Sequence, residues 1–582
     1  MSRFGWRGYL VFGLFLLGFG ILSVRLFYVQ ILRHEEFREL AEEQQKKILT
    51  IPARRGEIVD CKGRLVACSV TTRLIYVDPL LLENKERTAF ELARVLGLRV
   101  DDVWKKLYKR TRYEEIAREV TAEQLDALKP VFDKEWGVRV LTYYKRVYPF
   151  GRVGAQVIGF CDRDQAGLAG LERYHDAALT GISGERKIEV DSRRRGFVGE
   201  DLYVRKPVDG ARVVLNLDMY IQSIVDDALR ELADRWDPIS AAAVVMDPDT
   251  GAVLAMGSVP TFDPNEVHGL APEVLEESEK NRAVTDIFEP GSTMKPFVMY
   301  EALLSGVVTP EQRIFCENGL YIVGPRRLRD HRPFGWLSAS EVIMNSSNCG
   351  MAKIGVMLGA RRVREGVCRF GFDGKTGVDY PYEESGWVHP LSAWSLYTVT
   401  SVPIGQEICT TPLLLLRGYC ALANGRYLVT PRLTRAVGDR QTEVRRKEVL
   451  DPSTASKVRS MLREVVERGT GKRARLCRYS LAGKTGTAQL VDKTILPDGR
   501  VQASFSHTRF VASFCAFAPA ERPRIAVIVM AREPRKPGSH YGGVVASPVA
   551  AEIIGTVLPY LGVEPDQEGD YVSVGAFERT SD

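Results

Sequence analysis

The chain has 582 residues, of which 45% are hydrophobic and 26% charged, so it is neither disordered nor collagen-like and can build a large core in two to four domains. Lysine and arginine number 80 and aspartate and glutamate 74, and this near balance gives no support to a dedicated nucleic-acid binder. We therefore interpret the basic runs Arg193–Arg195 and Arg326–Arg329 as solvated surface. The ten cysteines and seven histidines are scattered without zinc-binding spacing, so we expect neither a metal site nor a cofactor.

The first apolar segment, residues 8–24, contains no charged side chain. As a helix it would span about 25 Å, slightly less than the ~30 Å hydrocarbon core of a bilayer, and residues 26–29 extend it if Arg25 reaches the headgroups. No small-residue cleavage site follows, which favours an uncleaved single-span anchor over a signal peptide, with a buried soluble helix as the alternative. Arginines flank both ends, so charge does not decide the orientation.

The region after the anchor divides into a stalk and a mixed domain. Residues 31–47 are charged and helix-prone, and we interpret them as a stalk leaving the membrane. Residues 49–218 combine short predicted strands and helices with many glycines. Their segments Arg55–Asp60 and Gly167–Glu172 have the composition of loops and turns and carry no catalytic constellation.

A second domain is predicted from a helix and four strands. Asp218 is a candidate N-cap for a helix with an apolar stripe that ends at Trp236. A hairpin of residues 241–246 and 252–259 follows, and near the C-terminus come strands at 510–517 and 524–531 and an apolar helix at 544–561. Strands at both ends with helices between them predict an α+β domain whose terminal strands share a sheet.

The first of three short motifs is Glu289–Phe297, in which Pro290 and Gly291 mark a helix start. Ser292 then lies in the first turn, and Lys295, three positions on, shares its face of the helix. A serine is a weak nucleophile until a base takes its proton, and a desolvated lysine amine can do so. The helix N-terminus also directs N–H groups at a developing oxyanion. Alone, the motif could be an ordinary helix cap.

The second motif is Ser346-Ser347-Asn348, and the third is Lys484-Thr485-Gly486-Thr487. The Ser346 hydroxyl could relay a proton to a leaving amine, while the Asn348 amide could hold both the lysine and the substrate backbone. Gly486 would let substrate approach the backbone, and Thr485 and Thr487 could bind a carboxylate beside Lys484. A similar run at Lys375–Gly377 is predicted to be a plain turn.

The order S-x-x-K, S-x-N, K-T-G is typical of serine penicillin-recognising enzymes, with 56 residues from Ser292 to Asn348 and 136 from Asn348 to Lys484. On these motifs the chain resembles a class B penicillin-binding protein, a monofunctional peptidoglycan D,D-transpeptidase. The further segments that carry the resemblance are Arg55–Ala67, Gly167–Leu179, Asp247–Pro260, Asp263–Asn265, Asn281–Asp286, Tyr541–Gly543 and Ser547–Val549. The run from Asn281 to Lys295 and the ending after Thr508 are most similar to the division-specific, FtsI-type enzymes.

The resemblance implies an α+β protein with four parts. These are a cytoplasmic tail and transmembrane anchor (1–30), a stalk and elongated mixed α/β pedestal, or dimerisation-like, domain (31–236), a transpeptidase domain with an antiparallel sheet flanked by helices as in serine β-lactamases (237–562), and a loose polar tail (563–582). It further implies an inner-membrane location with the catalytic domain on the extracytoplasmic side.

By resemblance, Ser292 attacks the penultimate D-alanine carbonyl of a stem pentapeptide and Lys295 is the base. Ser346 and Lys484 pass the proton to the leaving amine, Asn348 positions substrate, and the N–H groups of Ser292 and Thr487 form the oxyanion hole. The implied partners are peptidoglycan strands with D-Ala-D-Ala stem peptides, β-lactams, a membrane-embedded glycosyltransferase of the shape, elongation and division family, and other divisome proteins.

Two residues depart from the family pattern. Cys349 stands where a small aliphatic residue is more usual, and Cys61 where an arginine is usual, which leaves a Cys61–Cys68 bridge open. The alternatives are an elongation-specific paralogue, a D,D-carboxypeptidase, a β-lactamase-like hydrolase and a penicillin-binding sensor or scaffold. Against the hydrolase, no Glu-x-x-Leu-Asn segment lies between Asn348 and Lys484.

Overall fold

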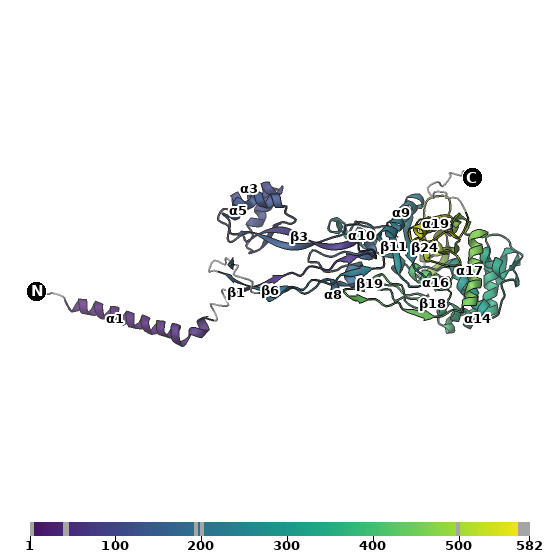
Figure 1. Ribbon diagram of the computed structural model, residues 1–582, viewed down its shortest axis with the longest axis horizontal. Coiled ribbons are helices and arrows are strands. Elements are labelled where there is room, and N and C mark those ends of the chain that lie inside the picture. Colours follow the sequence, from purple (N-terminus) through teal and green to yellow (C-terminus); the bar gives the residue numbers. More distant parts are fainter. Residues whose placement is uncertain (1–4, 39–45, 191–195, 198–202, 496–500, 569–582) are drawn as a thin grey trace. The chain divides into compact units, whose positions relative to one another are not determined.

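The computed structural model describes residues 5–38, 46–190, 196–197, 203–495 and 501–568 (Figure 1). It divides into two compact units, one made of residues 1–55 and 180–210 and the other of residues 56–179 and 211–582. The predicted surface run Arg193–Arg195 and residues 569–582 of the predicted tail lie outside the described residues.

The first unit contains the predicted apolar helix and a small sheet. Helix α1 (Trp6–Phe27) continues into the π-helical turn η1 (Tyr28–Leu32), and its apolar stretch, Gly8–Leu32, is 25 residues long with a mean hydropathy of 2.2 and no buried part. About 1.5 Å per residue makes this stretch long enough to cross a bilayer with Arg25 included. The helix therefore fits the predicted membrane anchor.

The small antiparallel sheet is centred on β6 (Gly184–Val190), which pairs with β1 (Lys46–Ile51), β7 (Gly196–Phe197) and β8 (Tyr203–Arg205). The predicted stalk helix of residues 31–47 is thus wrong at its end, because Lys46 already belongs to a strand. Residues 39–45 lie outside the described chain.

The second unit contains a seven-stranded sheet in the order β20-β19-β9-β2-β3-β4, with β5 also pairing with β3. Its strands are β2 (Ile58–Val59), β3 (Leu65–Val77), β4 (Glu114–Ala117), β5 (Val138–Val147), β9 (Val213–Leu215), β19 (Thr434–Val437) and β20 (Arg440–Gln441). Helices α3 (Lys85–Leu96), α4 (Val100–Leu107) and α5 (Ala122–Phe132) share a core with the end of β3. Because β9 pairs with β19, the predicted pedestal and transpeptidase segments are joined by strand hydrogen bonds.

Two pedestal segments that have the composition of turns hold buried ion pairs. Arg146 Nε lies 2.7 Å from Glu172 Oε1, and the two side chains are only 4% and 0% exposed. A second Arg146 nitrogen donates to the carbonyl of Gly56 at 2.7 Å. The Asp60 carboxylate, also buried, accepts from the backbone N–H groups of Lys62 and Arg64 and pairs with the Arg64 guanidinium. These segments therefore bind the pedestal together.

We expect Glu172→Gln to lower the free energy of unfolding by about 3–5 kcal/mol, because it leaves the Arg146 charge buried without its counter-ion. Urea unfolding of the purified chain, followed by fluorescence, would measure the loss. The control is Glu91→Gln, which breaks an exposed pair with Arg94 and is expected to cost at most about 1 kcal/mol. Equal losses in the two variants would contradict a structural role for the buried pair.

The centre of the second unit is a five-stranded antiparallel sheet in the order β11-β10-β24-β23-β22. Its strands are β10 (Pro238–Met246), β11 (Val253–Val259), β22 (Ala482–Ile495), β23 (Val501–Ala518) and β24 (Ile525–Pro534). The predicted hairpin and the predicted sharing of one sheet by N- and C-terminal strands are both confirmed.

This sheet is buried on both faces. Along β10, Ala241, Ala243 and Val245 belong to one apolar core, and the alternate residues Ala242, Val244 and Met246 belong to the other. Because successive side chains of a strand point to opposite faces, a continuous apolar run marks a strand covered on both sides. Helices α9 (Met219–Trp236) and α19 (Ser547–Tyr560) cover one face (Figure 1), and Asp218 caps α9 as predicted.

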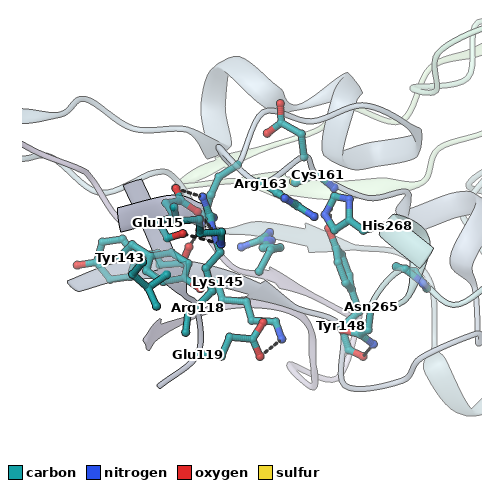
Figure 2. Close-up of a pocket in the computed structure, with 18 residues that line it drawn as sticks. Glu115, Arg118, Glu119, Tyr143, Lys145, Tyr148, Cys161, Arg163, Asn265 and His268 are labelled. Atoms are coloured by element: carbon teal, nitrogen blue, oxygen red, sulfur yellow. Dashed lines mark hydrogen bonds and ion pairs between the residues drawn. The ribbon is translucent and has the colours of Figure 1, made fainter. Parts of the chain in front are cut away.

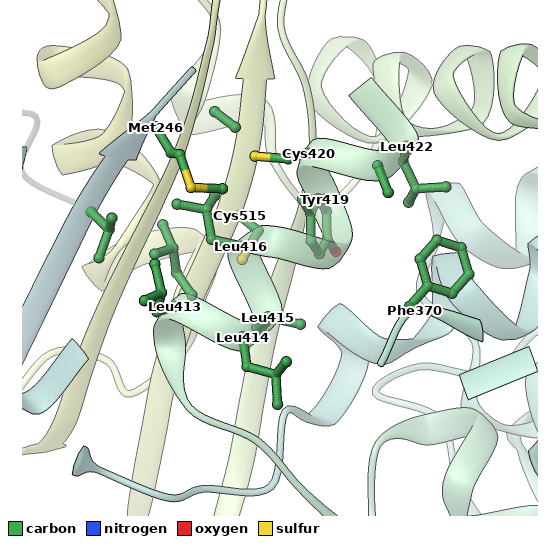
Figure 3. Packing of buried hydrophobic residues seen from close by; sticks show 14 of the residues in the cluster. Met246, Phe370, Leu413, Leu414, Leu415, Leu416, Tyr419, Cys420, Leu422 and Cys515 are labelled. Carbon is green, nitrogen blue, oxygen red and sulfur yellow. The ribbon is translucent and has the colours of Figure 1, made fainter. Parts of the chain in front are cut away.

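The other face is covered by the buried helix α16 (Pro412–Asn424), whose residues 412–423 are all buried. Figure 3 shows Leu413 and Leu416 of this helix near Met246 and Cys515 of the sheet. The helices α12 (Lys295–Leu304), α14 (Asn348–Arg369) and α17 (Pro452–Glu467) lie on this side of the core, and they carry or adjoin the predicted motifs.

The remaining elements of the second unit are short. They are α6 (Ala155–Ile158), α7 (Gly170–Tyr174), α8 (Asp176–Leu179), α10 (Pro272–Ser278), α11 (Arg282–Thr285), α13 (Ala339–Met344), α15 (Leu396–Ser401), α18 (Gly542–Val545), β12 (Arg313–Phe315), β13 (Leu320–Val323), β14 (Arg326–Arg329), β15 (Trp336–Ser338), β16 (Trp387–Val388), β17 (Ile408–Cys409), β18 (Tyr427–Val429), β21 (Arg446–Glu448) and the 3₁₀ turns η2 (Val267–Gly269), η3 (Gly291–Met294), η4 (Glu317–Gly319), η5 (Leu391–Ala393), η6 (Val402–Ile404) and η7 (Lys472–Ala474).

Two sequence interpretations change in the structure, and one question that the sequence left open is answered. Arg326 is not solvated surface, because its guanidinium donates to Gln406 at 2.8 Å and to the hydroxyl of Ser401. The start of the predicted loose tail is held in place, since Asp566 accepts from the N–H of Ser480 at 2.7 Å. All ten cysteines are free thiols, so no Cys61–Cys68 bridge is formed.

Candidate active site

Ser292 lies in the 3₁₀ turn η3, which leads directly into α12. Close backbone contacts with Gly405 hold this turn. The N–H of Gly291 donates to the carbonyl of Gly405 at 3.0 Å, and a Cβ built on Gly405 would lie 1.9 Å from the Gly291 oxygen. Gly291 itself has φ +55°, which favours glycine. The helix start predicted at Pro290 and Gly291 is thus a 3₁₀ turn, and the α-helix itself begins at Lys295.

The buried helix α16 reaches this turn through one aromatic residue. The Tyr419 hydroxyl donates to the Thr293 carbonyl at 2.9 Å, and its ring packs edge-to-face on Phe297 of α12 at 5.3 Å between centroids. Tyr419 is fully buried. The apolar core thereby fixes the height of the Ser292 turn above the sheet.

Lys295 is fully buried and faces the second motif. Its Nζ donates to the Ser346 carbonyl at 2.6 Å, to Ser346 Oγ at 3.1 Å and to Asn348 Oδ1 at 2.8 Å. Burial lowers the pKa of Lys295 to about 7, against the opposing charges of Asp330 and Cys349. An amine with this pKa is partly neutral near pH 7 and can accept a proton from a serine.

The loop that carries the second motif is conformationally unusual. Ser346 has φ +57°, a left-handed conformation that a non-glycine residue rarely adopts. Ser347 is the N-cap of α14, accepting from the N–H of Gly350 at 3.0 Å. The side-chain amide N–H of Asn348 donates to the carbonyl of Arg329 at 3.0 Å, while the amide oxygen accepts from Lys295. The amide is thus oriented by contacts on both sides.

The third motif lies on β22, the edge strand of the five-stranded sheet. Lys484 is fully buried, and its Nζ donates to the Thr485 carbonyl at 3.2 Å. Burial, with the positive charge of Lys295 as a second cause, holds the pKa of Lys484 well below its usual range. The two lysines are therefore near enough to influence each other, and the structure brings all three motifs together.

The glycine and the two threonines of the third motif make contacts within the protein that the sequence did not predict. A Cβ built on Gly486 would lie 2.4 Å from Ser513 Oγ and 2.8 Å from Thr293 Cγ2, so this glycine is required by packing within the protein. Thr485 shares a 2.9 Å hydrogen bond with the hydroxyl of Thr470. Thr487 Oγ1 accepts from the N–H of Gly542 at 3.1 Å.

The second lysine-threonine-glycine run was predicted to be a plain turn, but it is an irregular segment that follows the turn at residues 370–373. Glu383 accepts from the backbone N–H groups of Thr376 at 2.6 Å and of Gly377 at 3.1 Å, and the carbonyl of Lys375 accepts from Arg417 at 3.2 Å. Among the described residues, no hydrogen bond or ion pair joins the run Lys375–Gly377 to Lys295 or Lys484.

We expect Lys375→Ala to leave the rate of acylation by benzylpenicillin within about twofold of the wild type, since surface changes away from a site have small effects. Lys484→Ala, the same change in the third motif, is expected to slow it about 100-fold or more, because a preorganised amine that binds the penicillin carboxylate in a water-poor site is lost. Stopped-time labelling with a fluorescent penicillin measures both rates. A large loss in Lys375→Ala would reverse the assignment of the two runs.

A cavity of about 430 Å³ lies elsewhere, between pedestal residues and Pro264, Asn265 and His268 of the transpeptidase part, and no motif residue lines it (Figure 2). Figure 2 shows the ion pairs of Arg118 with Glu115 and of Lys145 with Glu119 along its wall. The cavity is thus separate from the site of the three motifs. No group of three or more metal-binding side chains was found among the described residues.

Several contributors to the site were missed from sequence. They are Asp330, the carbonyl of Arg329, Tyr419, Thr470 and the N–H of Gly542. His331 also lies near both lysines, and burial is the main cause that lowers its pKa. None of these residues has a motif-like spacing, and Arg329 belonged to a run interpreted as solvated surface.

Comparison with known protein families shows to which family the chain belongs. The family described as the penicillin binding protein transpeptidase domain matches residues 241–555, and the penicillin-binding protein dimerisation domain matches residues 50–215. The chain belongs to the class B penicillin-binding proteins. The predicted family is therefore confirmed.

Among curated relatives, this penicillin-binding protein is 32% identical to stage V sporulation protein D of Bacillus subtilis, over 95% of its own length and 86% of that protein's. It is 30% identical to the peptidoglycan D,D-transpeptidase FtsI of Escherichia coli K12, over 96% of its own length and 93% of the relative's.

Solved structures agree with the predicted fold. Penicillin binding protein 3 from Mycobacterium tuberculosis, complexed with aztreonam, is 27% identical with a TM-score of 0.67, covering 90% of this chain and 100% of that one. Penicillin binding protein 2X from Streptococcus thermophilus is 22% identical with a TM-score of 0.73, covering 89% and 81%. This penicillin-binding protein is accordingly a serine-type D,D-transpeptidase with an N-terminal apolar helix and a two-domain fold.

Proposed function

We propose that this penicillin-binding protein cross-links peptidoglycan stem peptides through an acyl-enzyme on Ser292. The observation that supports this most is the buried Lys295 amine, which Ser346 and Asn348 hold through three acceptors and whose pKa is lowered to about 7. A base poised near neutrality is what activation of a serine hydroxyl requires.

In the proposed reaction, Ser292 Oγ forms a bond to the penultimate D-alanine carbonyl as its proton passes to Lys295. The N–H groups of Ser292 and Thr487 stabilise the oxyanion. The bond to the terminal D-alanine then breaks, and Ser346 and Lys484 return the proton to the leaving amine. Finally, the amine of a neighbouring stem peptide forms a bond to the acyl carbon, the bond to Ser292 Oγ breaks, and the proton of the amine passes through Lys295 to Oγ, which frees Ser292.

Substrate recognition is proposed for the remaining motif residues. The carboxylate of the terminal D-alanine, or of a penicillin, is bound by Thr485 and Thr487 beside Lys484, with Gly486 between them. Asn348 orients the substrate backbone. An anionic group at this place raises the lowered pKa of Lys484, so that the amine binds it as a cation, and charge-assisted hydrogen bonds are stronger than neutral ones.

The reaction can be tested with a soluble stem pentapeptide as donor and a stem peptide with a free side-chain amine as acceptor. Mass spectrometry should show one D-alanine released per cross-linked dimer, and pretreatment with benzylpenicillin should stop both. Release of D-alanine with only the trimmed tetrapeptide, at saturating acceptor, would identify a carboxypeptidase. Covalent penicillin binding without any release would favour the sensor or scaffold.

We also propose a septal role with the catalytic domain on the extracytoplasmic side, anchored by the N-terminal helix as residues 1–30, with a pedestal over 31–236 and a transpeptidase domain over 237–562. The similarity to FtsI supports a septal role. The partners that we propose with it are a membrane-embedded glycosyltransferase and other divisome proteins. A fluorescent fusion should concentrate at the division site. Labelling of the lateral wall would instead indicate the elongation-specific role.

A further inference from the structure

Asp330 follows the hairpin of β13 and β14 and binds the start of α14. Its Oδ2 accepts from the Ser347 hydroxyl at 2.7 Å. Its Oδ1 accepts from the backbone N–H groups of Asn348 and, at 3.1 Å, of Cys349. The backbone of Asp330 is itself held, because its N–H donates to the carbonyl of Gly319 at 3.0 Å. One carboxylate thus takes up two unpaired N–H groups of a helix N-terminus and the hydroxyl of its N-cap.

These contacts lie directly behind the groups that face Lys295. Asn348 supplies one acceptor to the lysine and Ser346 supplies two. Ser346 holds a left-handed conformation, φ +57°, which persists only where the surroundings enforce it. The contacts of Asp330 with Ser347, Asn348 and Cys349 are part of those surroundings.

The hairpin adds a second attachment at the same place. The carbonyl of Arg329 accepts from the Asn348 amide at 3.0 Å, and the carbonyl of Leu328 accepts from the Cys349 thiol at 3.7 Å. The end of β14 and the first turn of α14 are therefore joined by a group of hydrogen bonds, to which Asp330 contributes a carboxylate.

We propose that Asp330 is a positioning residue for acylation, which holds the loop of Ser346–Asn348 in the conformation that presents its acceptors to Lys295. This inference rests on the proposed function of Ser292 and Lys295. Asp330 touches neither the substrate nor the reacting atoms, and it acts through the loop.

The charge of Asp330 has a separate effect on the lysine. The titratable groups that face Lys295 are Asp330 and Cys349, which raise its pKa against burial, and Lys484, whose own pKa is lowered by Lys295. The fourth is His331, whose pKa is lowered chiefly by burial and also by both lysines. Removing the negative charge at position 330 therefore lowers the pKa of Lys295, so that more of the amine is neutral in mild acid.

The test is the rate of acylation by benzylpenicillin across pH 5–9, measured on the full chain in detergent. In Asp330→Asn we expect the plateau rate to fall about 100-fold, because the loop loses its fixed geometry. The midpoint of the rising limb should move about one pH unit lower, because the carboxylate charge is gone. The final stoichiometry should stay at one penicillin per chain.

Asp379→Asn is the matched control. The Asp379 carboxylate likewise accepts from two consecutive backbone N–H groups, those of Leu433 at 2.6 Å and Thr434 at 2.7 Å. Its loss should lower the melting temperature and leave both the plateau rate and the midpoint unchanged.

An unchanged plateau and midpoint in folded Asp330→Asn would overturn the proposal. So would a reduced stoichiometry with a wild-type rate in the remaining fraction, which is the result of a purely structural role. If Asp330→Asn does not fold, Ser347→Ala decides, since it removes the 2.7 Å contact and keeps the charge. A slower plateau with an unmoved midpoint supports the proposal, and a wild-type plateau refutes it. Failure of the wild type to be acylated would refute the proposed function itself.

Discussion

Replacing Ser292 by alanine is expected to abolish the covalent penicillin adduct, because the other hydroxyl of the η3 turn, that of Thr293, is buried and donates to the Pro290 carbonyl at 2.6 Å. Intact-mass analysis of the chain after incubation with benzylpenicillin should show one adduct on the wild type and none on the variant. Ser305→Ala is the matched control, since this serine ends the same α12 helix and its hydroxyl bonds two carbonyls of that helix, Glu301 at 2.7 Å and Ala302 at 3.4 Å.

Two outcomes would count against the assignment. An adduct on Ser292→Ala would mean that another side chain is the nucleophile. Rapid loss of the wild-type adduct would mean that water resolves the acyl-enzyme quickly, as in a hydrolase. A stable one-to-one adduct that maps to Ser292 would leave the acceptor as the remaining question.

Replacing Lys295 by methionine is expected to slow acylation by about 10³–10⁴, the contribution of a well-placed general base. In the wild type the rate should rise with pH and reach half its plateau near pH 7, because the reactive amine is the neutral form and its pKa is lowered to about 7. The variant should lose this limb. Rates from quenched labelling with a fluorescent penicillin, taken at several pH values, measure both effects.

The same variant should be more stable than the wild type at neutral pH. An unfolded lysine has a pKa of about 10.4, so Lys295 releases a proton on folding between pH 7 and 10. The lowered pKa therefore reduces the free energy of unfolding of the wild type below pH 10, and the reduction is complete below pH 7. Methionine causes no such reduction. Lys353→Met is the control, since Lys353 is on α14 and binds the Phe315 carbonyl at 2.8 Å instead of the motif loop. An equal loss of rate in both variants would argue against a base at 295.

Local sequence patterns predicted the parts of the fold and site that local physics decides. The apolar run of 241–246 predicted a hairpin strand, and Asp218 predicted a helix start. The spacing of Ser292 and Lys295 places both at the start of one helix, and the order of the three motifs indicated that they meet.

The parts that could not be predicted depend on contacts between distant segments. Asp330 gains its role only because the hairpin before it lies against the start of α14, and nothing in its neighbours marks this. Arg326 was interpreted as surface because its partners, Ser401 and Gln406, are more than 70 positions away. Gly486 is a glycine because Thr293 and Ser513 crowd it, which only the folded chain shows.

During synthesis, the hairpin of β10 and β11 leaves the ribosome long before the strand beside which it finally lies. A nascent chain that ends before Ile525 already contains Ser292, Lys295 and Lys484, yet it lacks β24, which is inserted between β10 and β23. Until then one edge of the hairpin is unpaired and its apolar faces are incompletely covered, a condition that promotes aggregation. The central sheet of the catalytic domain therefore closes only after β24 has been synthesised, when all three motifs are already present in the nascent chain.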